Sequence, residues 1–477
     1  MITHPAFKKT KKVKLINNVL SGSKGSLFLN LEIKMDGKTI VNKRGDSLTA
    51  ALAKNMYRMM NYYQSSDDAI TQHVAARYTL GATPNRTITG VSDAGGEYSG
   101  KVKLTCSGGS GFDAATAYVI CQGLSVYTSL NNVQTACVYL SSTTVVIPSL
   151  TYSATDTGTL DHYAYITNSE STIINSTPYI RVGEADGAVT INDCDVYKRN
   201  YTLTHGTTSS SPHTNTYPSY TRFSCIVTNN TGSAIVIREL GLFVGVIDSG
   251  NSRQLLMARE VLAAPISIPA TSNITINYDV GVDVTSGGTN DGGFTYAFSA
   301  WLNAHLRYTQ TAGWTDIYGG GHTVINNASG TSGSPNSLFL AGRAADRINM
   351  KSGTEYDTNV GVFVGTGDTA VAITDYNLAT RIAHGIAATQ LYHWATIVDN
   401  WVNGAGYVSY DIVRLFENRS GGTITIAETG LAASFNYNST YSYVHKAGLI
   451  ARNVLTTPVD VDNGEILKVT YTIRIEV

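Results

Sequence analysis

The sequence predicts a mainly β protein with two tandem copies of a β-sandwich-like domain, one short helix in each, and an inserted Ig-like β-sandwich. Three observations favour this fold class. Only 14% of the 477 residues are charged, while glycine reaches 45 residues, a composition that suits short strands joined by turns. Long segments alternate apolar and polar residues, as in a strand with one buried face. One segment pattern occurs twice, which indicates duplicated domains.

The repeat is clearest at the end of the sequence. Residues 451–461 read ARNVLTTPVDV and residues 258–268 read AREVLAAPISI, and an alternating strand follows each, at 467–477 and 274–284. Arg452 follows Arg259 by 193 positions, Glu428 follows Glu239 by 189, and Asp375 follows Asp193 by 182. Such small steps are expected where the loops between matching strands differ slightly in length. The chain therefore reads as a tandem duplication.

Residues 1–25 are predicted to form a basic N-terminal anchoring arm. Five lysines crowd this segment: Lys8, Lys9, Lys11, Lys12 and Lys14. One interpretation is a solvated tail, as is common at termini. The other is an assembly arm that lies on a neighbouring subunit or an acidic surface. A single short lysine run is too weak a signal to indicate a nucleic-acid partner.

The first β repeat is predicted over residues 26–84 and 176–284. Residues 26–45 read as two strands joined by a hairpin turn at Asp36-Gly37. A helix is expected to follow, capped by Asp46 or Ser47 and continuing through Met59. Residues 206–220 are expected to be a loop, because serine, threonine and proline dominate them.

Residues 85–175 have no counterpart later in the chain. Several short apolar or alternating runs, some separated by Gly- and Ser-rich turns, predict an inserted Ig-like β-sandwich there. The second β repeat is then expected over residues 285–477. It contains a second helix candidate, residues 296–308, and long loops at 286–293 and 319–337.

Two pairs of charged residues recur with the repeat: Glu239 with Arg259, and Glu428 with Arg452. One interpretation is a catalytic acid with a positioning arginine. We favour the other, an internal ion pair that fixes strand register in each copy, because charged groups beside buried strands are usually paired. Asp375 is predicted instead to cap a helical turn.

No motif in the sequence indicates catalytic residues, a metal or a cofactor. The ten histidines lack metal-ligand spacing, the Gly-rich runs lack the Lys-Ser/Thr of a phosphate loop, and no G-x-S-x-G is present. A net charge of −1 gives no bias toward nucleic acid or membrane, and no apolar run approaches spanning length. Five cysteines, with none in the second copy, favour assembly in a reducing cytoplasm over a disulfide framework.

Residues 364–378, VGTGDTAVAITDYNL, resemble a recurrent segment of tailed-bacteriophage virion proteins, in which an I-x-E-x-G-L strand follows. The closing ARxVLxxPVxV is similar to the ends of such proteins. The first copy departs from the pattern, with Glu184-Ala185 where Thr366-Gly367 stand in the second. The resemblance implies a virion structural subunit of the tail, neck, collar or fibre apparatus. It would assemble in the host cytoplasm, with other virion proteins and as a homo-oligomeric ring or trimer.

Two alternatives stay open. The chain could be an adhesin that recognises host surface glycans through the inserted domain or through aromatic residues such as Trp394 and Trp401. It could also be a depolymerase, which would need two carboxylates about 5–10 Å apart. The sequence offers no carboxylate pair for that role, so we expect no enzyme activity.

Overall fold

The structure is a computed structural model. It describes the following residues: 12–20, 26–45, 48, 75–77, 86–108, 111–114, 116–165, 178–190, 193, 195–213, 219–248, 251–283, 293–307, 312–324, 355–404, 407–439 and 442–476. The described part is mainly β, as the sequence predicts. The expected helix over residues 46–59 lies outside the described residues except for Leu48, which forms an isolated bridge with Ala258.

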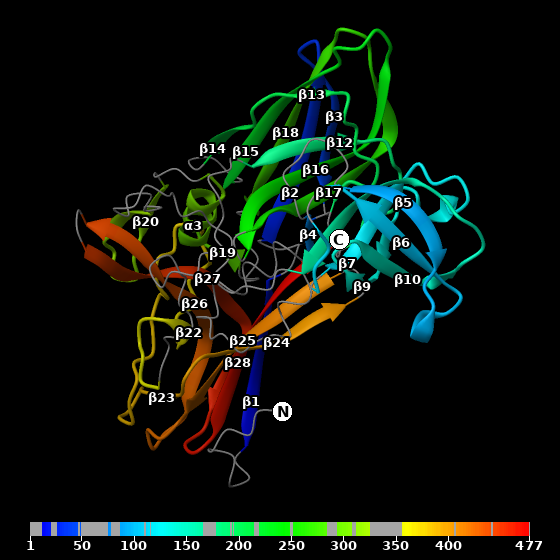
Figure 1. The fold of residues 1–477 in the computed structure, drawn as a ribbon. Helices are drawn as coiled ribbons and strands as arrows, with labels where there is room; N and C mark the ends of the chain where they lie inside the picture. The colour runs from blue at the N-terminus through cyan, green and yellow to red at the C-terminus, as the bar shows by residue number, and fades with distance from the viewer. Residues whose placement is uncertain are drawn as a thin grey trace.

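The first unit is a β-sandwich of two sheets with an apolar interior (Figure 1). One sheet contains β2 (Ser26–Met35), β3 (Lys38–Gly45), β13 (Thr204–His205), β14 (Ser209–His213), β15 (Ser219–Thr228) and β18 (Asn273–Asp283). The other contains β12 (Tyr179–Gly183), β16 (Ile235–Asp248) and β17 (Asn251–Ile268). The alternation in β18 points Ile274, Ile276 and Tyr278 inward, all fully buried, as the sequence predicts.

The second unit has two sheets with the same order of pairing. One contains β1 (Val13–Leu20), β23 (Tyr392–His393), β24 (Ile397–Gly404), β25 (Tyr407–Glu417) and β28 (Ile466–Glu476). The other contains β19 (Gly293–Phe294), β22 (Gly361–Gly365), β26 (Ile424–Ser439) and β27 (Ser442–Val461). The expected helix forms as α3 (Tyr296–Arg307), followed by a small hairpin of β20 (Ala312–Thr315) and β21 (Gly321–Val324).

The long hairpins of the two units are interrupted at matching places. In β16–β17 the register shifts between Ile237 and Glu239 and again after Leu242. In β26–β27 it shifts between Ile426 and Glu428 and again after Leu431, each 189 positions later. A bulge re-aims the side chains that follow it. The same two irregularities therefore give Glu239 and Glu428 the same local setting.

The N-terminal strands join the two units. β1 pairs in parallel with β28, the last strand of the second unit, whereas β2 pairs antiparallel with β18 of the first. In Figure 1 the two blue strands follow one another along the length of the molecule, from the start of β1 at the bottom to the β2–β3 turn at the top. Residues 13–20 thus lie in a sheet of their own chain, although the sequence predicts them as part of an anchoring arm.

The inserted unit continues a sheet of the first unit. Short β4 (Ala75–Arg77) pairs with both β17 and β11, so one sheet runs from β12 into the insertion. The unit keeps its own apolar core, which includes Val102, Leu104 and Val145. Its elements are β5 (Arg86–Asp93), η2 (Gly96–Tyr98), β6 (Lys101–Ser107), β7 (Thr116–Gln122), η3 (Thr128–Leu130), β8 (Gln134–Ala136), β9 (Val138–Ser141), β10 (Thr144–Thr151) and β11 (Gly158–Tyr165).

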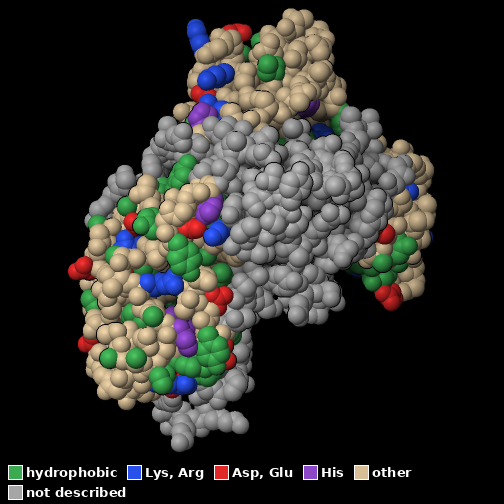
Figure 2. Space-filling view, turned by 90° about the vertical axis from the view of Figure 1, so that its left-hand side faces the viewer, with side chains coloured by type: hydrophobic (Ala, Val, Ile, Leu, Met, Phe, Trp, Pro, Cys, Tyr) green, Lys and Arg blue, Asp and Glu red, His purple; other side chains and the backbone are tan. Residues whose placement is uncertain are grey.

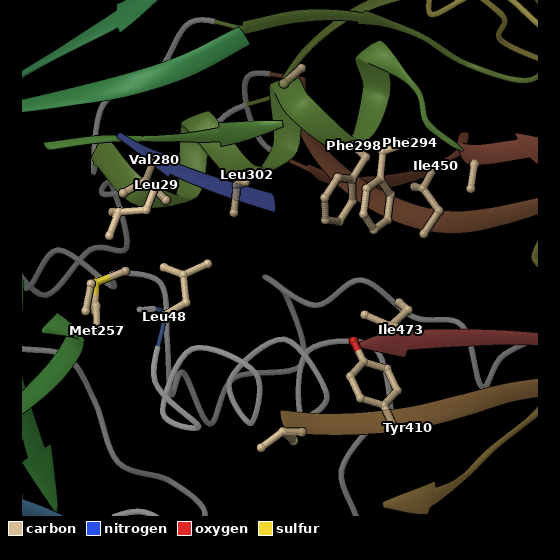
Figure 3. Close-up of a cluster of buried hydrophobic side chains, with 14 of the residues drawn as sticks. Leu29, Leu48, Met257, Val280, Phe294, Phe298, Leu302, Tyr410, Ile450 and Ile473 are labelled. Carbon is tan, nitrogen blue, oxygen red and sulfur yellow. The ribbon is translucent and has the colours of Figure 1, made fainter. Parts of the chain in front are cut away.

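One hydrophobic cluster runs through both units and through α3. Figure 3 shows Leu29 and Val280 of the first unit, Leu302 of α3, and Ile450 and Ile473 of the second around the same interior. A single packed core resists relative movement of the elements that line it. None of the helices within the described ranges has the length and apolar character needed to span a bilayer.

Candidate functional site

The first repeated charge pair is buried between the β16–β17 hairpin and the segment that follows β12, on the sheet face opposite the apolar core. Arg259 on β17 donates from Nη2 to Oε2 of Glu239 at 2.8 Å, and from Nη1 to Oδ2 of Asp193 at 3.0 Å. All three side chains are fully buried. Nε also donates to Oε2 of Glu239, at 3.0 Å, and Nη1 and Nη2 donate further to the carbonyls of Ala188 and Gly187. The cation is thus matched by two carboxylates and two carbonyls, as burial of a charge requires.

Glu239 also fastens two parts of the segment between β12 and β13 to the sheet. Its Oε1 accepts hydrogen bonds from the backbone N–H of Lys198 at 2.7 Å and of Ala185 at 3.3 Å. Its Oε2 accepts from the N–H of Tyr197 at 2.9 Å. The aromatic ring of Tyr197 then covers the Arg259 guanidinium, 3.8 Å from the ring centroid. One carboxylate therefore satisfies backbone donors that no strand partner reaches.

The second unit repeats this arrangement. Arg452 donates to Glu428 at 2.8 Å and to Asp375 at 2.7 Å. Glu428 accepts from the backbone N–H groups of Gly367, Ala379 and Thr380, which follow Ala185, Tyr197 and Lys198 by 182 positions. The two clusters differ in two ways. Ala379 occupies the position of Tyr197, so no ring covers Arg452 from that position. The Asp375 side chain is 21% exposed, whereas that of Asp193 is fully buried. The second cluster is therefore the more open one.

These clusters leave little room for chemistry. Burial alone would lower the pKa of Arg259. The nearby carboxylates of Glu239 and Asp193 raise it by more, so the net effect is a raised pKa. The balance is similar for Arg452, with Asp375 and Glu428 as the carboxylates. A carboxylate that is buried and held by a cation and by backbone donors is not available to a substrate. The geometry thus favours the internal ion pair over the catalytic interpretation, and it gives Asp375 this role in place of a helix cap.

The basic arm is described only from Lys12 onward. Lys8, Lys9 and Lys11 lie outside the described residues. Lys12 and Lys14 lie 3.7 and 3.9 Å from the carboxylate of Glu465, which precedes β28. Lys12 is largely exposed and Lys14 is partly exposed, so these pairs add little stability.

A group of aromatic side chains forms an open surface at one end of the second unit. We define this aromatic surface as Tyr356, His384, Tyr392, Trp394 and Arg419. Tyr356 is 54% exposed, and its φ of 78° is a strained conformation for a bulky residue. The Arg419 guanidinium lies over Tyr392, 4.0 Å from the ring centroid, and 5.8 Å from that of Trp394. On the face of the molecule drawn in Figure 2, hydrophobic, histidine and basic side chains lie close together at the lower left.

Hydrogen bonds hold the residues of the aromatic surface in place. The Tyr392 hydroxyl donates to Glu355 and forms a second hydrogen bond with the Tyr356 hydroxyl, and these hydrogen bonds raise the pKa of Tyr392. Arg414, fully buried, donates to the carbonyl of Trp394 at 2.6 Å and to three other carbonyls. Its burial lowers the pKa of Arg414 to about 10. The positions of the rings are therefore set by contacts within the chain.

Comparison with known proteins yields no relative: no protein-family model, no curated protein and no solved structure matches this chain.

Sequence reasoning missed two features of these sites. Asp193 and Asp375 recur in the repeat, yet their place beside the Glu–Arg pairs was not predicted, although that recurrence was a usable signal. The aromatic surface is assembled from residues up to 63 positions apart, and only Trp394 was singled out beforehand. Within the described ranges no group of His, Cys, Asp and Glu side chains is placed to hold a metal ion.

Proposed function

We propose that this chain is a structural subunit of a tailed-bacteriophage particle and acts by assembling with other virion proteins and with copies of itself. The resemblance of residues 364–378 to virion proteins supports the viral assignment. We also take the two units as tandem copies of one β domain. Their matching bulges and Glu–Arg–Asp clusters support the duplication.

The observation that carries the assembly role is the N-terminal segment that belongs to both units. β1 and β2 complete one sheet each, and a common core lies between the units, so the chain forms a rigid block. Within the described ranges, β1 pairs only with β28 and β3 only with β2. An edge strand presents unpaired backbone groups to a neighbouring chain. On β1, Leu15 is an apolar side chain that is 60% exposed.

Sedimentation velocity of the full chain tests self-assembly. We expect a discrete oligomer, a ring or a trimer, at micromolar concentration. Leu15→Lys places a charge on the outer face of β1 without entering the core, and we expect it to weaken association at least tenfold. Ile226→Lys is the matched control, because Ile226 is 52% exposed on β15 in the other unit. A wild-type chain that stays monomeric would contradict the proposal.

The viral assignment has a separate test. Mass spectrometry of the purified particle from the source of this sequence should detect the chain in several copies per particle. Its absence from the particle would remove the viral role and leave only an assembling β protein.

The aromatic surface favours a second candidate function, an adhesin that recognises host glycans. Trp394 and Tyr392 offer preordered rings beside Arg419, and aromatic faces with a polar rim suit sugar recognition. Tryptophan fluorescence titrated with neutral oligosaccharides tests this function. Trp394→Ala should abolish binding, whereas Tyr376→Ala, at a 45% exposed ring outside the surface, should not. Equal binding by both variants would exclude this surface.

A further inference from the structure

A cavity of about 340 Å³ lies in the first unit, between β12 and the segment that leads into β13. Its lining includes Tyr179, Arg181, Arg199, Tyr201 and His205. This volume falls within the range of small-ligand sites in proteins. The Tyr201 hydroxyl donates to Asp161 of β11, so the cavity adjoins the inserted unit.

Among the described residues, the cavity has a positive charge without a carboxylate partner. Arg199 donates to the buried Asp195 at 2.9 Å and is thereby neutralised. Arg181 is half-buried, and the described part of the chain places no carboxylate within ion-pair distance of it. Its guanidinium lies against two rings instead, 4.9 Å from the centroid of Tyr179 and 5.6 Å from that of Phe243. A partly desolvated arginine of this kind has strong donors ready for an anion.

The neighbouring groups restrict the ligand further. His205 places Nδ1 at 3.2 Å from the carbonyl of Leu203, and a carbonyl only accepts, so the proton is on Nδ1. Burial, with a smaller effect of Arg181, lowers the pKa of His205 to about 4, so this ring is neutral near pH 7. Arg181 is therefore the charge that an incoming anion meets. Tyr201 and Leu203 add apolar surface to a cavity larger than a simple anion needs.

The second unit differs at the same place. His393 follows His205 by 188 positions and pairs with β25 as His205 pairs with β15. Phe363 occupies the position of Arg181, 182 places later, with Arg381 over its ring at 4.5 Å. The cation of the first cavity is thus replaced by a ring in the second unit. The second unit therefore shows the same site without the Arg181 cation.

We propose that the first cavity binds a carboxylated sugar residue, with the carboxylate on Arg181 and the ring beside Tyr201. The site depends only on the first unit and not on the assembly role proposed above. A failure to bind sugar would leave the oligomer unchanged, and a monomeric chain would leave this cavity intact.

Isothermal titration of the full chain with methyl glucuronide tests the proposal, with methyl glucoside as the neutral probe. We expect a Kd on the order of 1 mM for the acid, near the weak end of specific binding, and at least tenfold weaker binding of the glucoside. Arg181→Gln should weaken glucuronide binding at least tenfold, and Arg181→Lys should restore part of it. Arg238→Gln is the matched control, because Arg238 lies on β16 away from the cavity, paired at 3.8 Å with Asp186.

Three results would overturn the proposal. One is the absence of binding at a methyl glucuronide concentration about tenfold above the expected Kd. Another is equal affinity for glucuronide and glucoside. The third is inorganic phosphate or sulfate that binds as tightly as glucuronide, which would make the cavity a simple anion site. If Arg181→Gln lowers the melting temperature, glucuronide binding by Arg181→Lys and by the wild type still decides between these outcomes.

Discussion

Arg259 and Glu239 meet at 2.8 Å beneath the segment that follows β12, with both side chains fully buried. The equivalent pair in the second unit, Arg452 and Glu428, meets at the same distance. Removing one member of a buried pair leaves the other charge without compensation, which is far more costly than never having the pair. Each unit therefore depends on an interaction that mutation can test separately.

Arg259→Met should destabilise the chain by about 3–5 kcal/mol, because Glu239 and Asp193 would stay buried without their cation. The matched variant Arg452→Met should cost less, because Asp375 is 21% exposed and can be hydrated. Urea unfolding of the two variants measures both effects. A loss below about 1 kcal/mol for Arg259→Met would show that the pair is not needed for stability.

Gly365→Ala should disrupt the loop that Glu428 holds. A Cβ at this position would lie 2.6 Å from Oε1 of Glu428 and 2.5 Å from the carbonyl oxygen of Thr380, closer than atoms can approach. The carboxylate would have to move and lose backbone hydrogen bonds, at a cost of about 2–4 kcal/mol. Thermal unfolding measures this cost. Gly422→Ala, with open space around its Cβ, is the control and should behave as wild type.

Asp156→Asn should loosen the inserted unit alone. The Asp156 carboxylate accepts from the backbone N–H groups of Ser125, Val126, Tyr127 and Thr157. Burial opposes ionisation, but these bonds outweigh it and hold the pKa of Asp156 well below its usual range. An amide accepts fewer hydrogen bonds, so about 2 kcal/mol should be lost. Hydrogen exchange should accelerate at residues 125–127, while β16 and β26 keep their protection. Unchanged exchange at residues 125–127 would contradict this prediction.

His393→Phe should flatten the dependence of stability on pH. His393 is 2% exposed, and burial, followed by Arg414, His384 and Arg381, lowers its pKa to about 2. The unfolded chain binds a proton near pH 6.5 and the native chain does not, so stability falls as pH drops below that value. The slope from this residue is about 1.4 kcal/mol per pH unit.

The measurement is the unfolding free energy at several pH values between 4.5 and 6.5. The wild type should lose more stability over this range than His393→Phe, which keeps the aromatic contact with Phe416. Carboxylates with lowered pKa begin to reduce stability only below about pH 5, and they do so equally in both proteins, so they do not obscure the comparison. Parallel curves for the two proteins would show that His393 is not the group responsible.

Local sequence signals predicted the local structure well. The Asp36-Gly37 turn has φ of 51° and 75°, as the hairpin pattern requires. The helix expected over residues 296–308 is observed as α3, Tyr296–Arg307. The prediction failed at residues 209–213, which form strand β14 instead of a loop. Pro212 lies there in a strand that pairs only with β15 among the described strands, a position that tolerates proline. Hydrogen bonding to β15 makes this segment a strand, although its composition is typical of a loop.

The pairing of strands that are far apart in the sequence could not be predicted from it. Residues 13–20 resemble any basic, partly apolar terminus, and only the edge of β28 in the folded chain gives them a partner. The Asn18 side chain shows how specific this partner is, since it donates to Thr429 at 3.1 Å and accepts from Asn453 at 2.6 Å. The aromatic surface and the Arg181 cavity likewise depend on segments that only folding brings together.

Electron cryo-microscopy of the assembled full chain tests the central proposal most directly. The account predicts a closed ring or trimer in which every protomer has its N-terminal strand in the second unit and its β1 edge covered by a neighbour. Particles that are single protomers, with the β1 edge open to solvent at every concentration, would contradict it.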